Sequence, residues 1–166
     1  MVEPSVERPH MPDYGVDATD WDGLPWSWAA VRLATNRTFW VVTVAGDGRP
    51  HAMPAWGVWN DGEHRFAFSC GPRSRKAANL AVNPHVVVTD TAECVSIEDV
   101  ATAVEGERAD AWIGRYLDRY SYEAADLSAE FLRANRIFEV RPERAFGIIE
   151  REDAFASRAT RWRFID

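Results

Sequence analysis

The spacing of hydrophobic residues changes character near residue 38. Between residues 25 and 36, Trp28, Val31 and Thr35 recur at intervals of three and four, which predicts a helix. After it, β-branched and aromatic residues fill short runs that end at glycine-containing turns, a pattern typical of strands. Because no helix separates these runs, they indicate an antiparallel meander. Its three strands are expected at 38–44, 51–59 and 65–70.

The second half of the chain mixes the same two periods. A short helix is expected over 74–82, and aromatic stripes predict a helical segment or pair over 110–134. Gly106 is expected to form a bulge in a strand near 101–109. Further strands are expected at 85–91, 137–141, 145–149 and 159–164. Seven or eight short strands with two or three helices favour a small barrel, mostly β with some α, in the α+β class.

Size and composition indicate one globular domain. The chain has 166 residues, of which 46% are hydrophobic and 27% charged. Residues 1–24 are rich in Pro, Asp and Glu without an apolar period, so we expect an N-terminal arm there and a single domain over 25–166. No signal peptide is expected in the arm.

Charge and cysteine content exclude several classes of partner. A net charge of −7 lacks the excess of positive charge that proteins use to bind nucleic acid or an anionic membrane. The longest apolar run, at 39–45, is far too short to cross a bilayer. Cys70 and Cys94 share no short spacing, which excludes a disulfide framework or a zinc ribbon and favours a reducing compartment. We therefore expect a cytoplasmic protein.

Motifs of the commonest enzyme classes are missing from the sequence. It contains no GxSxG elbow, no GxGxxG turn and no GxxxxGK[ST] loop. The four histidines form no i, i+3 or i, i+4 pair, so no metal site is expected. If the protein is an enzyme, a bound cofactor carries its chemistry and no side chain is assigned as catalytic.

The basic residues before and within the 74–82 helix form an unusual pattern. Ser74 suits an N-cap, which places Arg75 and Lys76, the only lysine of the chain, in the first turn, with Arg73 just before it. Cations there oppose the helix dipole at a cost of about 0.3–1 kcal/mol each. A bound anion would make the same cations favourable at this helix end. The segment is either an exposed basic loop or a phosphate site, and the preceding Gly and Pro favour the latter.

The strand at 51–59 has features that weaken a sheet. Pro50 and Pro54 cannot donate to a ladder, and Gly57 has no side chain to pack. It is either an edge strand or one whose backbone a flat ligand approaches beside Trp56. The spacing of these residues favours the two interpretations equally.

Three sequence runs then resemble a known family: FWVVTVAGDGRPHAMPAWGVW, FAFSCGPRSRKAANLAVNPHVVV and VEGERADAW. They are similar to the pyridoxamine 5′-phosphate oxidase-like split β-barrel superfamily, the flavin/deazaflavin oxidoreductases. The resemblance covers roughly residues 28–109, with a weaker echo in the closing ATRWRF. It implies a six-stranded antiparallel split barrel with short flanking helices that forms a homodimer, with the cofactor at the subunit interface.

The resemblance also implies roles for individual residues. Arg75 and Lys76 would hold the cofactor phosphate. Hydrogen bonds would come from Ser69, Cys70 and Ser74, and the ring system would face Pro54, Ala55, Trp56 and Gly57. No substrate-binding motif of true pyridoxamine phosphate oxidases is found in 158–166.

Other residues keep two interpretations. Asn79 either bonds the phosphate or caps the next turn, and His51 either touches the ring or is a solvated strand residue. Trp56 and Trp162 are possible walls of a substrate pocket or simply packed aromatic residues.

The arginine-rich composition and the SRKAxNL run resemble those of the actinobacterial branch of this superfamily, which uses the deazaflavin F420. We therefore expect an oxidoreductase that transfers a hydride between F420 and a small molecule. The alternatives are the same scaffold with FMN and a non-catalytic carrier of either cofactor. F420 differs from FMN by an acidic lactyl-oligoglutamate tail, for which Arg73, Arg49 and Arg37 are candidate contacts.

Overall fold

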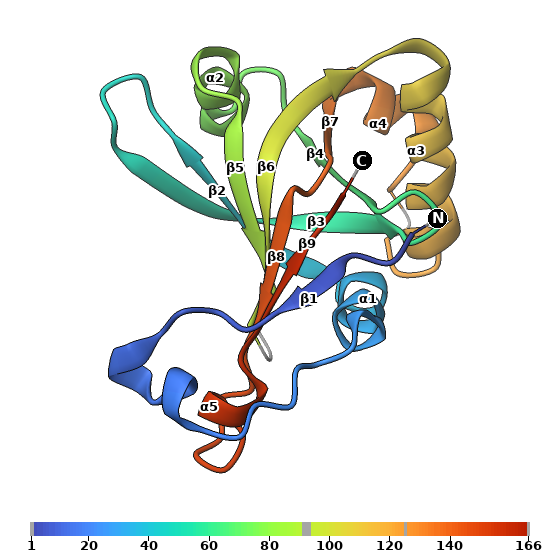
Figure 1. Cartoon of the computed structure of the whole chain (residues 1–166). Coiled ribbons are helices and arrows are strands. Elements are labelled where there is room, and N and C mark those ends of the chain that lie inside the picture. Colours follow the sequence, from blue (N-terminus) through green and yellow to red (C-terminus); the bar gives the residue numbers. More distant parts are fainter. Residues whose placement is uncertain (1, 91–93, 125, 166) are drawn as a thin grey trace.

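Six antiparallel strands close a barrel in the part of the chain that the computed structural model describes, residues 2–90, 94–124 and 126–165 (Figure 1). Each strand pairs with the next, and the last returns to the first. In order around the barrel they are β2 (Thr38–Val44), β3 (Pro50–Asn60), β4 (Arg65–Cys70), β7 (Arg136–Val140), β6 (Val95–Val104) and β5 (His85–Thr89). The expected meander over the first three strands is confirmed. The strand expected over 85–91 ends at Thr89, and Thr91 lies outside the described residues.

Two long strands change partner along their length, which splits the barrel into two sheets. In β3, residues 50–56 pair with β2, whereas residues 57–60 pair with β4. In β6, residues 96–100 pair with β5 and residues 101–104 with β7. The first half of β3 therefore has only one neighbouring strand. Pro50 and Pro54 lie in that half, where a missing N–H donor is tolerated.

Three further strands extend one sheet away from the barrel, and we call them with their connecting segments the sheet extension. Strand β8 (Arg144–Gly147) pairs with β6, β9 (Thr160–Arg163) with β8, and β1 (Ser5–Glu7) with β9. The expected N-terminal arm thus contributes a strand and two short 3₁₀ helices (Pro12–Tyr14, Val16–Ala18). Trp21 Nε1 donates to the Ala159 carbonyl at 2.7 Å and fastens the arm to the C-terminal segment, which includes α5 (Phe155–Arg158).

Helix α1 (Trp26–Thr35) forms where expected, but with a different buried face. Trp26, Ala29, Ala30 and Leu33 are buried, whereas Val31 of the expected stripe is 57% exposed. Trp26 and Leu33 pack into the core with the two small alanines between them, and the low hydrophobicity of the alanines hid this face in the sequence.

The helical pair expected over 110–134 is confirmed as α3 (Gly106–Tyr120) and α4 (Ala129–Ala134). The bulge expected at Gly106 is wrong: β6 ends at Val104, and Gly106 opens α3 with a positive φ of 57°. From there, apolar residues follow a helical period and pack on the outer face of β3 and β4. The buried ones on α3 are Trp112, Ile113, Tyr116 and Tyr120.

The barrel interior is filled by aromatic and β-branched side chains. Phe39, Phe66 and Phe68 are fully buried there, and a Cβ at Gly57 would lie 2.1 Å from the Phe66 ring. Gly57 is therefore required by packing inside the barrel. Helix α2 (Arg75–Val82) covers one end of the barrel, at the top of Figure 1. None of the described helices is long and apolar enough to cross a membrane.

Candidate cofactor-binding site

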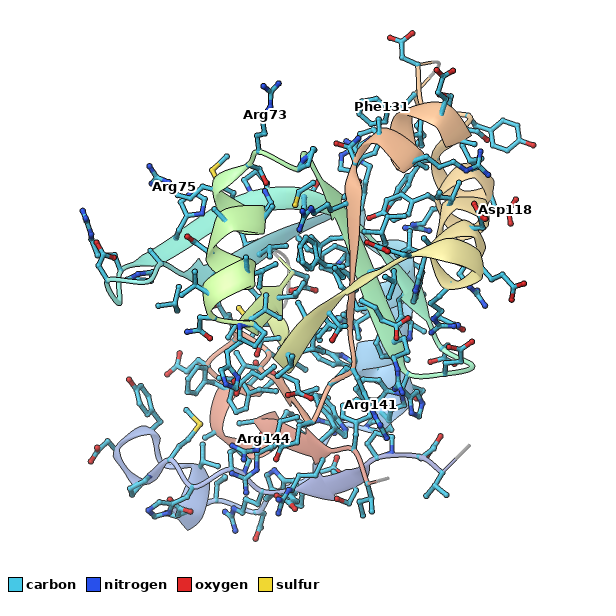
Figure 2. All side chains as sticks on the ribbon, turned by 90° about the horizontal axis from the view of Figure 1, so that it is seen from above. Arg73, Arg75, Asp118, Phe131, Arg141 and Arg144 are labelled. Carbon is cyan, nitrogen blue, oxygen red and sulfur yellow. The ribbon has the colours of Figure 1, made fainter. Side chains whose placement is uncertain are left out.

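The N-terminus of α2 carries the predicted anion site. The Ser74 hydroxyl accepts a hydrogen bond from the Ala77 backbone N–H at 3.2 Å, which confirms the N-cap. Arg73 and Arg75 are exposed and extend away from the body of the molecule (Figure 2), whereas Lys76 is 9% exposed. Among the described residues, Lys76 contacts no carboxylate and no hydrogen-bond acceptor. Most of the Lys76 side chain is therefore covered by the protein, while its unpaired ammonium is available to a bound anion.

The other cations of the chain show how unusual this is. All 18 arginines are described, and nearly all of them contact a carboxylate, a carbonyl or an aromatic ring. Within the described residues, the arginines without any such contact are Arg73, Arg75 and Arg136. Arg136 is the register partner of Cys70, the last residue before the turn into α2. The cations without a partner therefore gather in one place, which we call the α2 corner: Arg73, Arg75, Lys76 and Arg136.

A hollow of about 320 Å³ lies beside the α2 corner, between α2 and the β2–β3 turn. Arg75, Asn79 and His51 line it, together with Arg49 and other residues of the turn. Asn79 donates through Nδ2 to Thr43 Oγ1 at 2.9 Å, so its amide ties α2 to β2. His51 Nδ1 is buried and has no hydrogen-bond partner in the described part of the chain. A ligand in this hollow would therefore meet two polar groups besides the cations.

The two other candidate contacts for an acidic tail are already ion-paired. Arg49 bonds Asp47 at 2.6 Å, and this hydrogen bond holds the pKa of Asp47 below its ordinary value. Arg37 bonds Glu123 at 2.7 Å and lies 5.2 Å from the centre of the Trp56 ring. Of the three arginines expected to meet the tail, only Arg73 keeps an uncompensated charge among the described residues.

A second hollow, of about 290 Å³, brings together Trp56, predicted to face the ring, with Ser69 and Cys70, predicted to supply hydrogen bonds. Its other wall comes from α3, α4 and the segments beside them, through Tyr116, Leu127, Phe131, Leu132 and Asn135. Pro54 and Ala55 lie outside its lining, on the part of β3 that pairs only with β2.

Two tyrosines of α3 hold β3 where it changes partner. Tyr116 donates its hydroxyl hydrogen to the Trp56 carbonyl at 2.8 Å, and Tyr120 donates to the Gly57 carbonyl at 2.5 Å. Burial raises the pKa of the Tyr116 hydroxyl well above its ordinary value, which keeps it a donor. The sequence showed the helical stripe of these tyrosines, but nothing in it indicated that they bond β3.

Comparison with known proteins decides the family. A family model described as pyridoxamine 5′-phosphate oxidase matches residues 29–148, more than half of the chain. The chain belongs to this family. Among curated proteins, no match is found.

Solved structures share the fold of this pyridoxamine 5′-phosphate oxidase family member at low sequence identity. HutZ, the heme storage protein from Vibrio cholerae, is 24% identical with a TM-score of 0.55, over 66% of this chain and 83% of HutZ. An F420 reductase is 23% identical with a TM-score of 0.55, over 68% and 90%. The conserved hypothetical protein Rv2991 from Mycobacterium tuberculosis is 21% identical with a TM-score of 0.60, over 76% and 85%.

Two expectations for the site in this family member are wrong. Trp162 is completely buried, and its Nε1 donates to the Leu24 carbonyl at 3.2 Å, so it packs the core instead of lining a pocket. Gly57 faces Phe66 inside the barrel, so its missing side chain serves packing and not the approach of a ligand. The described residues also contain no group of three or more His, Cys, Asp or Glu that could hold a metal ion.

Proposed function

We propose that this protein is an oxidoreductase that transfers a hydride between the deazaflavin F420 and a small molecule. The observation that carries the proposal is the nearly buried, partnerless Lys76 beside Arg75 in the first turn of α2, on a pyridoxamine 5′-phosphate oxidase fold. Folding gains nothing from cations at this helix end, because they oppose the dipole. Binding of a phosphate explains their presence.

The residues present fit such a cofactor. Lys76, Arg75 and the free N–H groups of the first turn would hold the phosphate, with the Ser74 hydroxyl hydrogen still available as a donor. The hollow at Trp56, Ser69 and Cys70 offers an aromatic wall and two polar groups for a flat ring. Bound F420 would supply the hydride. The protein's own part is to orient the ring and to exclude water from it, for which the packing of α3 and α4 on β3 provides a wall.

F420 is preferred over FMN because the α2 corner holds more positive charge than one phosphate needs. Four cations without partners gather there in a chain of net charge −7. FMN carries a single phosphate, whereas F420 adds a tail of carboxylates. The likeness to an F420 reductase supports the same choice.

A non-catalytic binding protein is the second candidate. It is favoured by the likeness to HutZ, described as a heme storage protein, and to a heme-binding protein from Mycobacterium smegmatis, which is 15% identical with a TM-score of 0.56. The corner cations would then pair with the carboxylates of the bound group.

We further propose a homodimer with the cofactor at its interface. Residues 50–56 of β3 have one free edge, and apolar side chains are exposed on both strands of this hairpin. Trp40 and Met53 are 41% and 45% exposed. A second copy would cover this surface. Light scattering in the presence of F420 should give twice the 18.8 kDa mass of the chain, and a monomer mass would contradict the dimer.

Absorbance titration of the purified protein with F420, FMN and hemin in turn tests the function. The proposal predicts tightest binding of F420, and oxidation of reduced F420 when a panel of electron-poor acceptors is added. Binding without turnover across the panel would favour the carrier. Tightly held FMN in near-stoichiometric amount would leave the oxidoreductase proposal standing but replace F420 by FMN as the cofactor.

A further inference from the structure

Arg136 is the corner cation that sequence alone did not single out. It opens β7, on the far side of the site from Arg49 of the β2–β3 turn. It is exposed and contacts no acceptor in the described part of the chain. Neither the phosphate nor the ring needs a cation at this place.

The backbone brings Arg136 close to the start of α2. Its register partner across β4 and β7 is Cys70, and Ser74 N–H donates to the Gly71 carbonyl at 2.9 Å, so one tight turn leads from β4 into α2. From standard strand and turn spacings, the Cα atoms of Arg136 and Ser74 are at most roughly 16 Å apart. One extended ligand can therefore contact both.

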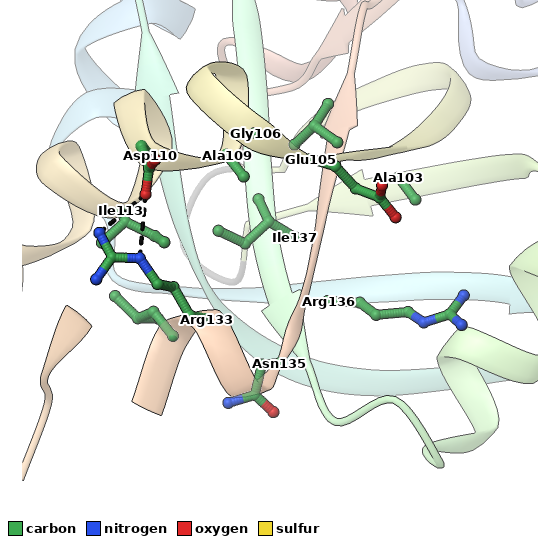
Figure 3. Close-up of a pocket in the computed structure, with 12 residues that line it drawn as sticks. Ala103, Glu105, Gly106, Ala109, Asp110, Ile113, Arg133, Asn135, Arg136 and Ile137 are labelled. Atoms are coloured by element: carbon green, nitrogen blue, oxygen red, sulfur yellow. Dashed lines mark hydrogen bonds and ion pairs between the residues drawn. The ribbon is translucent and has the colours of Figure 1, made fainter. Parts of the chain in front are cut away.

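Arg136 also lines a hollow of about 510 Å³ between β7, α4 and the start of α3 (Figure 3). This hollow adjoins the hollow at Trp56, because Leu132 and Asn135 line both. A ligand whose ring occupies the hollow at Trp56 would therefore lie next to the hollow lined by Arg136.

The other charges of this hollow leave Arg136 as its free cation. Arg133 bonds Asp110 at 2.9 Å, as Figure 3 shows, so these two neutralise each other. Glu105 is the remaining charged side chain of the lining, and it opposes an anionic ligand. Arg136 extends away from the Arg133–Asp110 pair in the same view.

We propose that Arg136 binds an anionic group beyond the phosphate, so that the carboxylate tail of F420 runs from α2 past β7 into this hollow. This inference rests on the proposed function and gives the tail a direction. Arg49 of the β2–β3 turn is paired with Asp47, and Arg37 is paired with Glu123, so neither of these two arginines offers an unpaired charge to the tail.

The test compares the affinity for F420 with several glutamates and for F420 with none, by fluorescence titration at low salt. The wild-type protein should bind the longer form more tightly. In R136Q this gain should fall by roughly two- to fivefold, the range for one exposed ion pair, with little change for the form without glutamates. R136K should retain the gain. E105Q should increase it, because the opposing charge is removed.

R144Q is the matched control. Arg144 is an exposed arginine that bonds Glu143 at 3.2 Å on β8, away from α2 (Figure 2), and its loss should leave the tail gain unchanged. An equal gain in R136Q and wild type, with F420 still bound, would overturn this inference and leave the proposed function standing. Binding of neither form would overturn both, and an equal loss in R144Q would show only a general charge effect and overturn the role of Arg136.

Discussion

Arginines are used in opposite ways in the sheet extension and at the α2 corner. In the extension, Glu7 bonds Arg161 at 2.8 Å and lies 3.9 Å from Arg163, and Arg158 pairs with Asp22. These pairs join the N-terminal arm to the C-terminal strand. At the α2 corner, no carboxylate of the described residues compensates the cations.

The difference separates charges that serve the fold from charges that serve a ligand. Pairs in the extension connect segments more than 130 residues apart, so they contribute to holding the sheet together. At the corner, Arg75 and Lys76 oppose the α2 dipole, so they reduce stability unless an anion is bound. Substitutions at the α2 corner should therefore lower the affinity for F420 without lowering the free energy of unfolding. Substitutions of charges that serve the fold should lower the free energy of unfolding without changing the affinity.

The largest effect is expected for Lys76→Ala. The affinity for F420 should fall by roughly 1.5–3 kcal/mol, the range for a charge-assisted hydrogen bond. The free energy of unfolding without cofactor should stay the same or rise, because a cation that opposes the α2 dipole is removed. Titration and urea unfolding measure the two quantities. Arg151→Ala, at an exposed arginine near Asp153, is the control and should change neither; equal affinities of both variants would contradict the anion site.

The substitution Glu139→Ala, beneath α3, should have the opposite effect: a loss of stability with unchanged affinity for F420. The Glu139 carboxylate accepts hydrogen bonds from Trp112 Nε1 at 2.7 Å and from Arg108 at 2.6 Å. Its removal leaves a buried indole N–H without a partner, so the free energy of unfolding should fall by about 1–3 kcal/mol. F420 affinity should remain, and Glu139→Gln should lose less stability. A large loss of affinity with intact stability would contradict the assignment of this carboxylate to the fold.

A smaller effect is expected for Glu7→Gln in the sheet extension. The exposed pairs with Arg161 and Arg163 should contribute at most about 1 kcal/mol to the free energy of unfolding, and less at high salt. F420 affinity should not change. Urea unfolding at two salt concentrations checks this, and a salt-independent loss would mean that the carboxylate acts by other means than its charge.

The smallest effect is expected from acid on the Glu63–Arg108 pair. The hydrogen bond from Arg108 lowers the folded-state pKa of Glu63, so the unfolded chain takes up the proton first. The pair therefore stabilises the fold fully above about pH 5, and this contribution is lost as the pH falls through the folded pKa. Glu63→Gln should lose less stability on acidification than the wild type, and parallel pH profiles would contradict the role of the pair.

Local signals in the sequence predicted much of the fold and part of the site. The strand over 65–70 and the Ser74 cap depend on neighbouring residues, and both are confirmed. The start of α3 was missed because a glycine between strand and helix reads equally as a bulge.

Residues whose role depends on distant partners could not be predicted. Arg136 lies near the start of α2 only because β7 pairs with β4, 66 residues earlier in the chain. Gly57 could not be explained without Phe66, and Arg37 could not be set aside without Glu123. Only tertiary structure separates paired from unpaired arginines.

A crystal structure of the protein with bound F420 tests the central claim most directly, because it locates the phosphate. We predict that the phosphate oxygens lie within hydrogen-bond distance of Lys76 Nζ and of the first-turn N–H groups of α2. A phosphate bound at the β2–β3 turn or in the sheet extension, with Lys76 left without a partner, would contradict the account.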